Sequence, residues 1–326
     1  MKWMKALVAT MAFGTAACCA SAGLAQVIRD PAALGSAPTL SDPRQIKKSG
    51  IRSGTAWISE ADAQGQLGAD ARIGYWRFLE DGNVQESTAF DRDGAMLQDL
   101  TYVYDDRGLV VESITRGTSA LGISKTQYRY DGANRLIESK SFTFDGSLLL
   151  RTEYEYDGAG KMIGMRAVSP DTARNVRARM TYGPNGKLSE TTVFDAAGKI
   201  KSRVALTYDD AGNQRQQISF AAGDAVMTAT SSTYDGNGRI IRETVKNANG
   251  AAVHESTYRY DDVGNVIETV IASPTAGTMT KMTFVYDANG NFQEAGTYNK
   301  LNQLVSRIRY VYEYFASDKS PVPEQK

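Results

Sequence analysis

The chain has 326 residues, of which 42% are hydrophobic and 23% are charged, with 37 Lys and Arg against 37 Asp and Glu. This composition excludes a generally disordered chain, and the even charge argues against a nucleic-acid partner, which needs a basic face and usually a basic excess. The length allows one large domain or two ordinary ones.

The first 25 residues have the order of a secretory signal peptide. A basic start, MKWMK, leads into the apolar and small-residue run ALVATMAFGTAACCA and then into SAGLAQ, which offers small residues at cleavage points 20–22 and 23–25. We therefore expect an exported protein, periplasmic or secreted. Removal of Lys2 and Lys5 leaves 35 basic against 37 acidic residues.

Cys18 and Cys19 are the two cysteines of the chain, and both precede the expected cut. The exported chain then has no thiol for a disulfide, a nucleophile or a metal ligand. A lipoprotein acylated at Cys18 is the alternative, although Thr15 stands where such signals have an aliphatic residue. No later segment is apolar enough to predict a transmembrane helix.

An aromatic residue recurs every 26 residues without insertion or deletion. This column consists of Phe78, Tyr104, Tyr130, Tyr156, Tyr182, Tyr208, Tyr234, Tyr260, Tyr286 and Tyr312. A second column, two residues earlier, is aromatic or apolar in nearly every repeat. Because side chains two apart on a strand share a face, each repeat presents this pair on one side of a strand.

A turn signature follows the aromatic residue, as in YDDRG at 104–108. Asp at the first position and Gly at the fourth are typical of a type I turn, in which the carboxylate caps backbone N–H groups and Gly takes the left-handed conformation. Asn134 replaces Gly in one repeat, and Asn tolerates that conformation. An apolar residue such as Val110 then marks the return strand.

A second turn lies halfway through the period, as in FDRDG at 90–94 and FTFDG at 142–146. Each unit is thus a β-hairpin, which is barely stable alone and needs its neighbours. The sequence predicts an all-β chain of tandem 26-residue hairpins that form a long twisted or superhelical antiparallel sheet. An open sheet of this kind leaves two edge strands.

The predicted organisation follows from where the period fails. We expect a signal peptide at 1–25, a flexible linker at 26–49, a degenerate N-terminal capping repeat at 50–70, the repeat array at 71–314 and a flexible tail at 315–326. The capping repeat lacks the aromatics, yet Ile58 keeps the register of the later inward positions.

These columns resemble the YD repeat of the RHS (rearrangement hot spot) family, whose units read Tyr-Asp-x-x-Gly followed by an aliphatic residue. The stretches YDGNGRIIRETV (234–245) and YDDVGNVIETV (260–270) match it closely, and the resemblance covers residues 71–314. It implies an extracytoplasmic, surface or binding role, since members form toxin-enclosing shells, extracellular barrels or wall-associated sugar-binding proteins. This chain departs from the large members: it is a short form without the shell core segment Asp-Pro-x-Gly or a toxin domain. A weaker resemblance is to MORN-type repeats, which lack the regular Asp.

An acidic column stands eight residues after the aromatic in six of nine repeats, two beyond the aliphatic position, so we expect both on one face. The candidate ligand face consists of Tyr102, Tyr104, Tyr128, Tyr130, Tyr154, Tyr156, Glu86, Glu112, Glu138, Glu190, Glu268 and Glu294. Two interpretations are open. The carboxylates are satisfied by tyrosine hydroxyls or by strand arginines such as Arg129 and Arg259, or they form with the rings a groove for a sugar chain or a cationic polymer.

The sequence favours a non-enzymatic role without cofactor or metal. The acidic residues recur by repeat position, whereas a catalytic carboxylate pair is singular. His254 is the single histidine, which argues against a triad or a His-ligated metal, and the segments DRDG and DGNG lack the spacing of a calcium loop. We predict a binding or scaffold protein for a cell-envelope polysaccharide. The alternatives are a protein-interaction module that acts through exposed edge strands, binding an envelope protein or a second copy of itself, and a glycan hydrolase.

Overall fold

The computed structural model describes residues 43–117 and 123–316. The expected signal peptide and both cysteines lie outside this part, as do most of the linker and nearly all of the tail. The described residues form a short helix, α3 (Pro43–Ser49), two 3-10 turns, η2 (Thr172–Arg174) and η3 (Ala222–Asp224), and twenty strands. The strands are β1 (Ile51–Glu60), β2 (Ala71–Phe78), β3 (Val84–Phe90), β4 (Met96–Tyr104), β5 (Val110–Gly117), β6 (Ile123–Tyr130), β7 (Leu136–Thr143), β8 (Leu148–Tyr156), β9 (Met162–Val168), β10 (Val176–Tyr182), β11 (Leu188–Phe194), β12 (Ile200–Tyr208), β13 (Gln214–Ala221), β14 (Val226–Tyr234), β15 (Ile240–Asn247), β16 (Ala252–Tyr260), β17 (Val266–Ser273), β18 (Thr278–Tyr286), β19 (Phe292–Tyr298) and β20 (Leu304–Tyr314).

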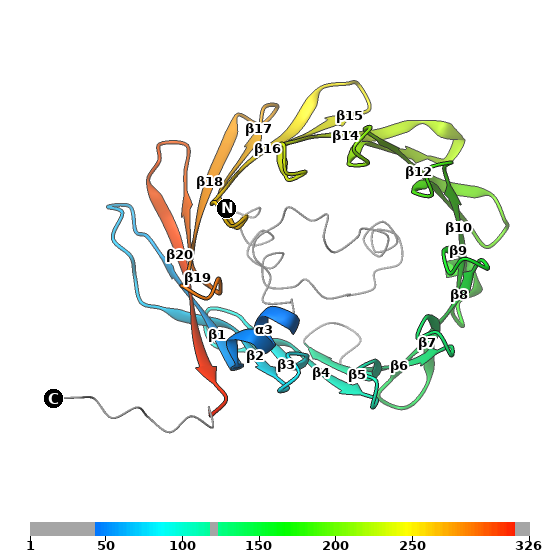
Figure 1. Ribbon diagram of the computed structural model, residues 1–326, viewed down its shortest axis with the longest axis horizontal. Coiled ribbons are helices and arrows are strands. Elements are labelled where there is room, and N and C mark those ends of the chain that lie inside the picture. The colour runs from blue at the N-terminus through cyan, green and yellow to red at the C-terminus, as the bar shows by residue number, and fades with distance from the viewer. Residues whose placement is uncertain (1–42, 118–122, 317–326) are drawn as a thin grey trace.

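The sheet closes on itself (Figure 1). Consecutive strands pair antiparallel along the chain, and β1 pairs both with β2 and with β20. The prediction of an all-β antiparallel structure is confirmed, but the prediction of an open twisted or superhelical sheet is wrong. Curvature accumulated over twenty strands brings the last strand back to the first, and their pairing removes both edges.

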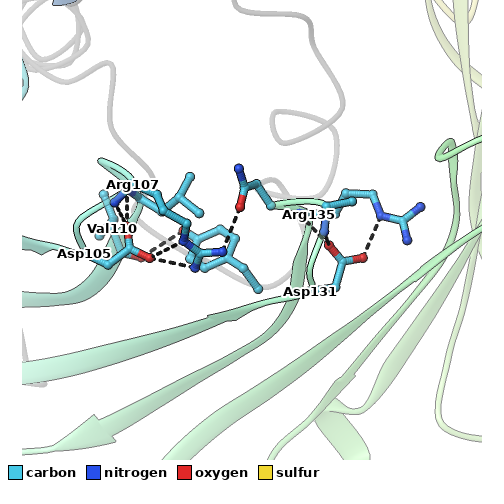
Figure 2. A network of polar contacts seen from close by, with 9 residues as sticks. Asp105, Arg107, Val110, Asp131 and Arg135 are labelled. Carbon is cyan, nitrogen blue, oxygen red and sulfur yellow. Dashed lines mark hydrogen bonds and ion pairs between the residues drawn. The ribbon is translucent and has the colours of Figure 1, made fainter.

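Each repeat turns where the sequence predicts. In the first complete unit the Asp105 carboxylate accepts hydrogen bonds from the backbone N–H groups of Arg107 (3.0 Å) and Leu109 (2.9 Å), and Gly108 has φ 76°. Asn134 takes the same conformation with φ 62°. Figure 2 shows these neighbouring turns linked, because the Arg107 guanidinium also donates to the Asn134 side chain at 2.8 Å. The turn chemistry is therefore confirmed.

The main aromatic column forms a ladder between hairpins. Each tyrosine hydroxyl donates to the backbone carbonyl of the residue twenty positions earlier: Tyr104 Oη lies 2.6 Å from the Val84 oxygen, and Tyr208 Oη lies 2.8 Å from the Leu188 oxygen. The same bond recurs at Tyr130, Tyr156, Tyr182, Tyr234, Tyr260, Tyr286 and Tyr312. Burial raises the pKa of the Tyr104 phenol, so the hydroxyl stays a donor. The repeated tyrosines thus tie each hairpin to its neighbour.

The seam of the barrel is built from small residues on β1 and large rings beside it. Gly54 lies opposite Trp76 of β2 and Ala56 lies opposite Tyr310 of β20, and these two rings stack across β1 with centroids 5.8 Å apart. Ile58 is buried in the same cluster, as its predicted inward register requires. The N-terminal repeat lacks the two aromatic columns, and its neighbours' rings fill the space over Gly54 and Ala56.

Helix α3 lies against the inner side of the ring over this seam (Figure 1). Ile46 is buried against Phe78 and Tyr312, and Gln45 donates to the Asn289 carbonyl oxygen at 2.7 Å. Residues 43–49 thus differ from the flexible linker predicted for 26–49, because Ile46 anchors them by burial. Since α3 touches Phe78 and Tyr312, the main aromatic column faces the inside of the barrel.

The turn carboxylates make the stability of the fold depend on pH. Backbone N–H groups, first that of Arg239, hold the pKa of Asp235 below its usual range, and Asp105 and Asp131 are lowered in the same way. An Asp whose pKa is lower in the folded than in the unfolded chain stabilises the fold at any pH above the unfolded pKa, about 3.9. This contribution is lost as the pH falls from there through the folded pKa. We expect the urea midpoint to drop between pH 6 and pH 3.

Asp235→Asn is the control for this pH effect. Asn247 already caps a turn of this kind through the same backbone contacts, so the amide keeps the backbone bonds and loses the titration together with the Arg239 ion pair. The variant should show a smaller drop in urea midpoint than the natural chain over the same interval. Equal drops in both proteins would assign the acid sensitivity to other groups.

Candidate functional site

A register shift beside the main aromatic residue of each YD hairpin separates the tyrosines of the predicted ligand face from its glutamates. Tyr104 lies opposite Val110, but Val103 lies opposite Glu112, so Val111 is an extra residue in the return strand. The same shift occurs in the other YD hairpins. Residues directly opposite one another share a face, which puts the apolar column inside with the tyrosines and the acidic column outside. The expectation of one shared face is wrong.

The candidate tyrosines lie in pairs on the inner face of three strands. Tyr102 and Tyr104 are on β4, Tyr128 and Tyr130 are on β6, and Tyr154 and Tyr156 are on β8, and all six are half-buried. The hydroxyl of the second member of each pair donates to the backbone, as described above. The Tyr128 hydroxyl shares a hydrogen bond of 3.1 Å with Ser113.

The candidate glutamates lie around the outer wall, and most meet a basic side chain. The pairs are Glu86 with Arg77 (2.8 Å), Glu112 with Lys125 (3.4 Å), Glu190 with Arg203 (3.0 Å) and Glu268 with Arg259 (3.4 Å). Glu294 lies opposite Arg309 in the β19–β20 register. The interpretation that strand arginines satisfy the acidic column is confirmed for Glu86, Glu190 and Glu268, whereas the partner of Glu112 is a lysine.

Glu138 is the centre of the densest group of charges. It is 6% exposed and contacts three cations: Arg151 at 2.6 Å, Arg129 at 3.2 Å and Lys140 at 3.4 Å. Burial alone would raise the pKa of this carboxyl, but hydrogen bonds from Arg151, Arg129 and Lys140 hold it below its usual range. Glu138 is therefore a charged anchor that fixes three basic side chains.

Two hollows adjoin this group on the outer wall. One, of about 560 Å³, is lined by residues that include Glu112, Gln127, Arg129, Glu138 and Lys140. The other, of about 510 Å³, is lined by residues that include Arg116, Lys125, Gln127, Phe142 and Phe144. Gln127 lines both, so they meet on β6. We call the two together the outer groove.

The outer groove brings together only part of the predicted face. Glu112 and Glu138 line it from the outer wall, and Tyr128 borders it on β6 with its ring on the inner face. The other five candidate tyrosines do not line it, and Glu86, Glu190, Glu268 and Glu294 lie on other strands of the wall. Sequence reasoning missed Lys125 and Gln127. The alternation in KTQYRY (125–130) could have revealed them, because it puts Lys, Gln and Arg on one face of the strand and Thr and two Tyr on the other.

Within residues 43–117 and 123–316, no group of three or more His, Cys, Asp or Glu side chains is arranged to hold a metal ion. In the same part of the chain, no helix is long and apolar enough to cross a membrane.

Comparison with known proteins gives structural likenesses but no relative in sequence. No protein-family model matches the chain. No curated protein matches it either. Among solved structures, a TcdB2-TccC3 complex without its hypervariable C-terminal region is 12% identical, with 77% of this chain and 18% of that chain covered and a TM-score of 0.29. Porin-like proteins from Bacteroides uniformis (9% identity, 81% and 98% covered, TM-score 0.35) and Bacteroides vulgatus (13%, 69% and 97%, TM-score 0.31) also match.

The chain spans less than a fifth of the toxin-complex chain that it matches. At TM-scores below 0.5, none of these likenesses carries an argument about function. The outer groove and the inner tyrosine rows are therefore interpreted from their own chemistry.

Proposed function

We propose that the chain is an exported, non-enzymatic YD-repeat protein that binds carbohydrate of the cell envelope. The observation that carries this proposal is the outer groove, whose lining combines the Phe142 and Phe144 rings with amide, carboxylate and cationic groups. Sugars present both apolar C–H faces and hydroxyl groups, so they suit a surface of this mixed composition. The inner tyrosines support the wall on which the groove lies.

A binding role fits the arrangement of the carboxylates better than catalysis. The groove carboxylates Glu112 and Glu138 are both engaged by basic side chains. The pKa of Glu138 lies below its usual range, whereas a general acid for glycoside cleavage needs a raised one. An interaction through exposed edge strands loses its basis, because β1 and β20 pair with each other.

The test is an array of envelope polysaccharides probed with the full chain and two tryptophan variants. Gln127→Trp fills the groove at the point where its two hollows meet, and we expect it to weaken glycan binding by about tenfold or more, since the ligand loses its contact surface. Ser231→Trp, at the same place of the repeat on the outer wall of β14, should bind as the natural chain does. No binding of any envelope glycan, or equal effects of the two variants, would contradict the proposal.

A further inference from the structure

The carboxylates of the outer groove are buried below its cations. The side chain of Glu138 is 8% exposed and that of Glu112 is 27% exposed, whereas Arg129 is 62% exposed and Lys125 is 44% exposed. Arg116 repeats this order, because the side chain of its partner Asp99 is 12% exposed and that of Arg116 is 43% exposed. The carboxylates therefore hold the basic side chains in place, and the groups that a ligand meets first are positively charged hydrogen-bond donors.

The cations are spread along the groove rather than gathered at one point. Lys125 and Arg129 lie on the same face of β6 and are four residues apart, which corresponds to about 13 Å along a strand. Arg116 stands on β5 and Lys140 on β7, one on either side. A small anion meets one or two of these side chains, whereas a polymer with a charge on successive units meets all four.

An aromatic ring stands at the end of the second hollow. Phe144, in the turn after β7, is 81% exposed, and Phe142 and Gln127 line the same hollow. A large apolar side chain left in solvent beside a lined hollow is a stacking surface, and the flat C–H face of a sugar ring is a partner for it. The ring thus favours a saccharide over an acidic peptide as the polymer.

We propose that the outer groove binds an acidic polysaccharide, a glycan with carboxylates on successive sugars, which lies along β5–β7 with its charges on Arg116, Lys125, Arg129 and Lys140 and a sugar ring on Phe144. This inference rests on the proposed function and names the class of glycan. It assigns the buried carboxylates to the protein's own framework.

The experiment compares polygalacturonate, its neutral methyl ester and polyglutamate as probes of the full chain by isothermal titration. We expect polygalacturonate to bind best, with affinity falling steeply as salt rises because the contacts are between charges. The variant Lys125→Gln/Arg129→Gln should weaken this binding about tenfold or more, and Phe144→Ala should weaken it several-fold. All three side chains are exposed, so these variants are expected to fold.

Arg242→Gln/Arg259→Gln is the matched control. Arg259 stands five repeats after Arg129, pairs with Glu268 as Arg129 pairs with Glu138, and is 67% exposed, while Arg242 pairs with Glu255. This control should leave polygalacturonate binding unchanged. Equal losses in the two double variants would show that any outer cation serves, and would overturn the proposal.

The other outcomes distinguish a failure of the acidic class of glycan from a failure of carbohydrate binding itself. If the methyl ester binds as well as polygalacturonate, the carbohydrate function stands and the acidic class is wrong. If polyglutamate binds as well as polygalacturonate, the groove takes polyanions in general, which overturns a glycan-specific site. If envelope glycans bind on the array but neither form of polygalacturonate does, the acidic class fails while the proposed function survives. Failure of every glycan on the array removes both.

Discussion

Gly82→Ala is expected to lower the free energy of unfolding by about 2–5 kcal/mol, the range for losing a buried aliphatic side chain from a core, because the added methyl displaces α3 and with it Ile46. Gly82 has φ +89°, and a Cβ there would stand 1.9 Å from the carbonyl oxygen of Pro43 and 3.0 Å from the backbone nitrogen of Lys47. Backbone atoms cannot rotate away as a side chain does, so α3 must shift. Its displacement exposes Ile46, which is buried at 3%.

Gly94→Ala separates this clash from ordinary backbone strain. Gly94 has φ +83°, nearly the same as Gly82, but nothing lies within 4 Å of its Cβ position. The alanine there meets only the cost of a left-handed conformation, about 1–2 kcal/mol. Urea denaturation of both variants measures the difference. Equal losses would mean that α3 contributes little to the barrel.

Hydrogen exchange locates the effect. In Gly82→Ala, amides of residues 44–50 should exchange much faster than in the natural chain, while amides of β8–β11 on the far side of the ring should change little. In Gly94→Ala no segment should respond in this way. A uniform increase around the ring in Gly82→Ala would instead indicate that the barrel opens as one cooperative unit.

The hairpins and their turns were predictable because short, repeated residue patterns determine them. The 26-residue period, the two turns of each hairpin and the left-handed Gly108 and Asn134 all follow from turn chemistry within five residues. The inward register of Ile58 was also correct. These features depend on residues that are neighbours in the sequence.

The face of the acidic column was not predictable by counting residues. The extra residue in each return strand is Val111, Ile163 or Ile241 in three of the repeats, and an aliphatic residue in a strand carries no mark of a bulge. One extra residue moves Glu112 to the opposite face. The predicted face was therefore wrong in assembly, because its tyrosines and glutamates lie on opposite sides of the wall.

Closure of the ring and the position of α3 also lay beyond sequence patterns. Whether twenty strands return to the first depends on small twists summed around the sheet, and no single residue sets that sum. The sequence does indicate where the helix begins, because Pro43 stands at its first position, where proline is favoured. No sequence pattern indicates that the helix packs against Phe78, more than thirty residues later.

Phe292→Ala is expected to destabilise the chain by about 3–5 kcal/mol and to make it associate. Phe292 is 7% exposed, and its ring lies 4.9 Å from Tyr310, 5.9 Å from Tyr286 and 6.1 Å from Phe284, measured between centroids. It belongs to the cluster that holds β19 and β20 against β1. Loss of this ring weakens one of the two clusters in which the closing strands are held by packing between the two ends of the described chain.

Phe194→Ala is the matched change on the outer wall. Phe194 ends β11 and lies beneath the Arg177 guanidinium at 4.8 Å, half-buried, so its loss should cost about 1 kcal/mol. Urea midpoints measure the two costs, and light scattering at rising protein concentration measures association. Only Phe292→Ala should show mass that grows with concentration, because an opened seam offers unpaired edges of β1 and β20 to a second molecule. A monomeric Phe292→Ala variant with lowered stability would mean that the β1–β20 hydrogen bonds hold the ring closed without this aromatic cluster.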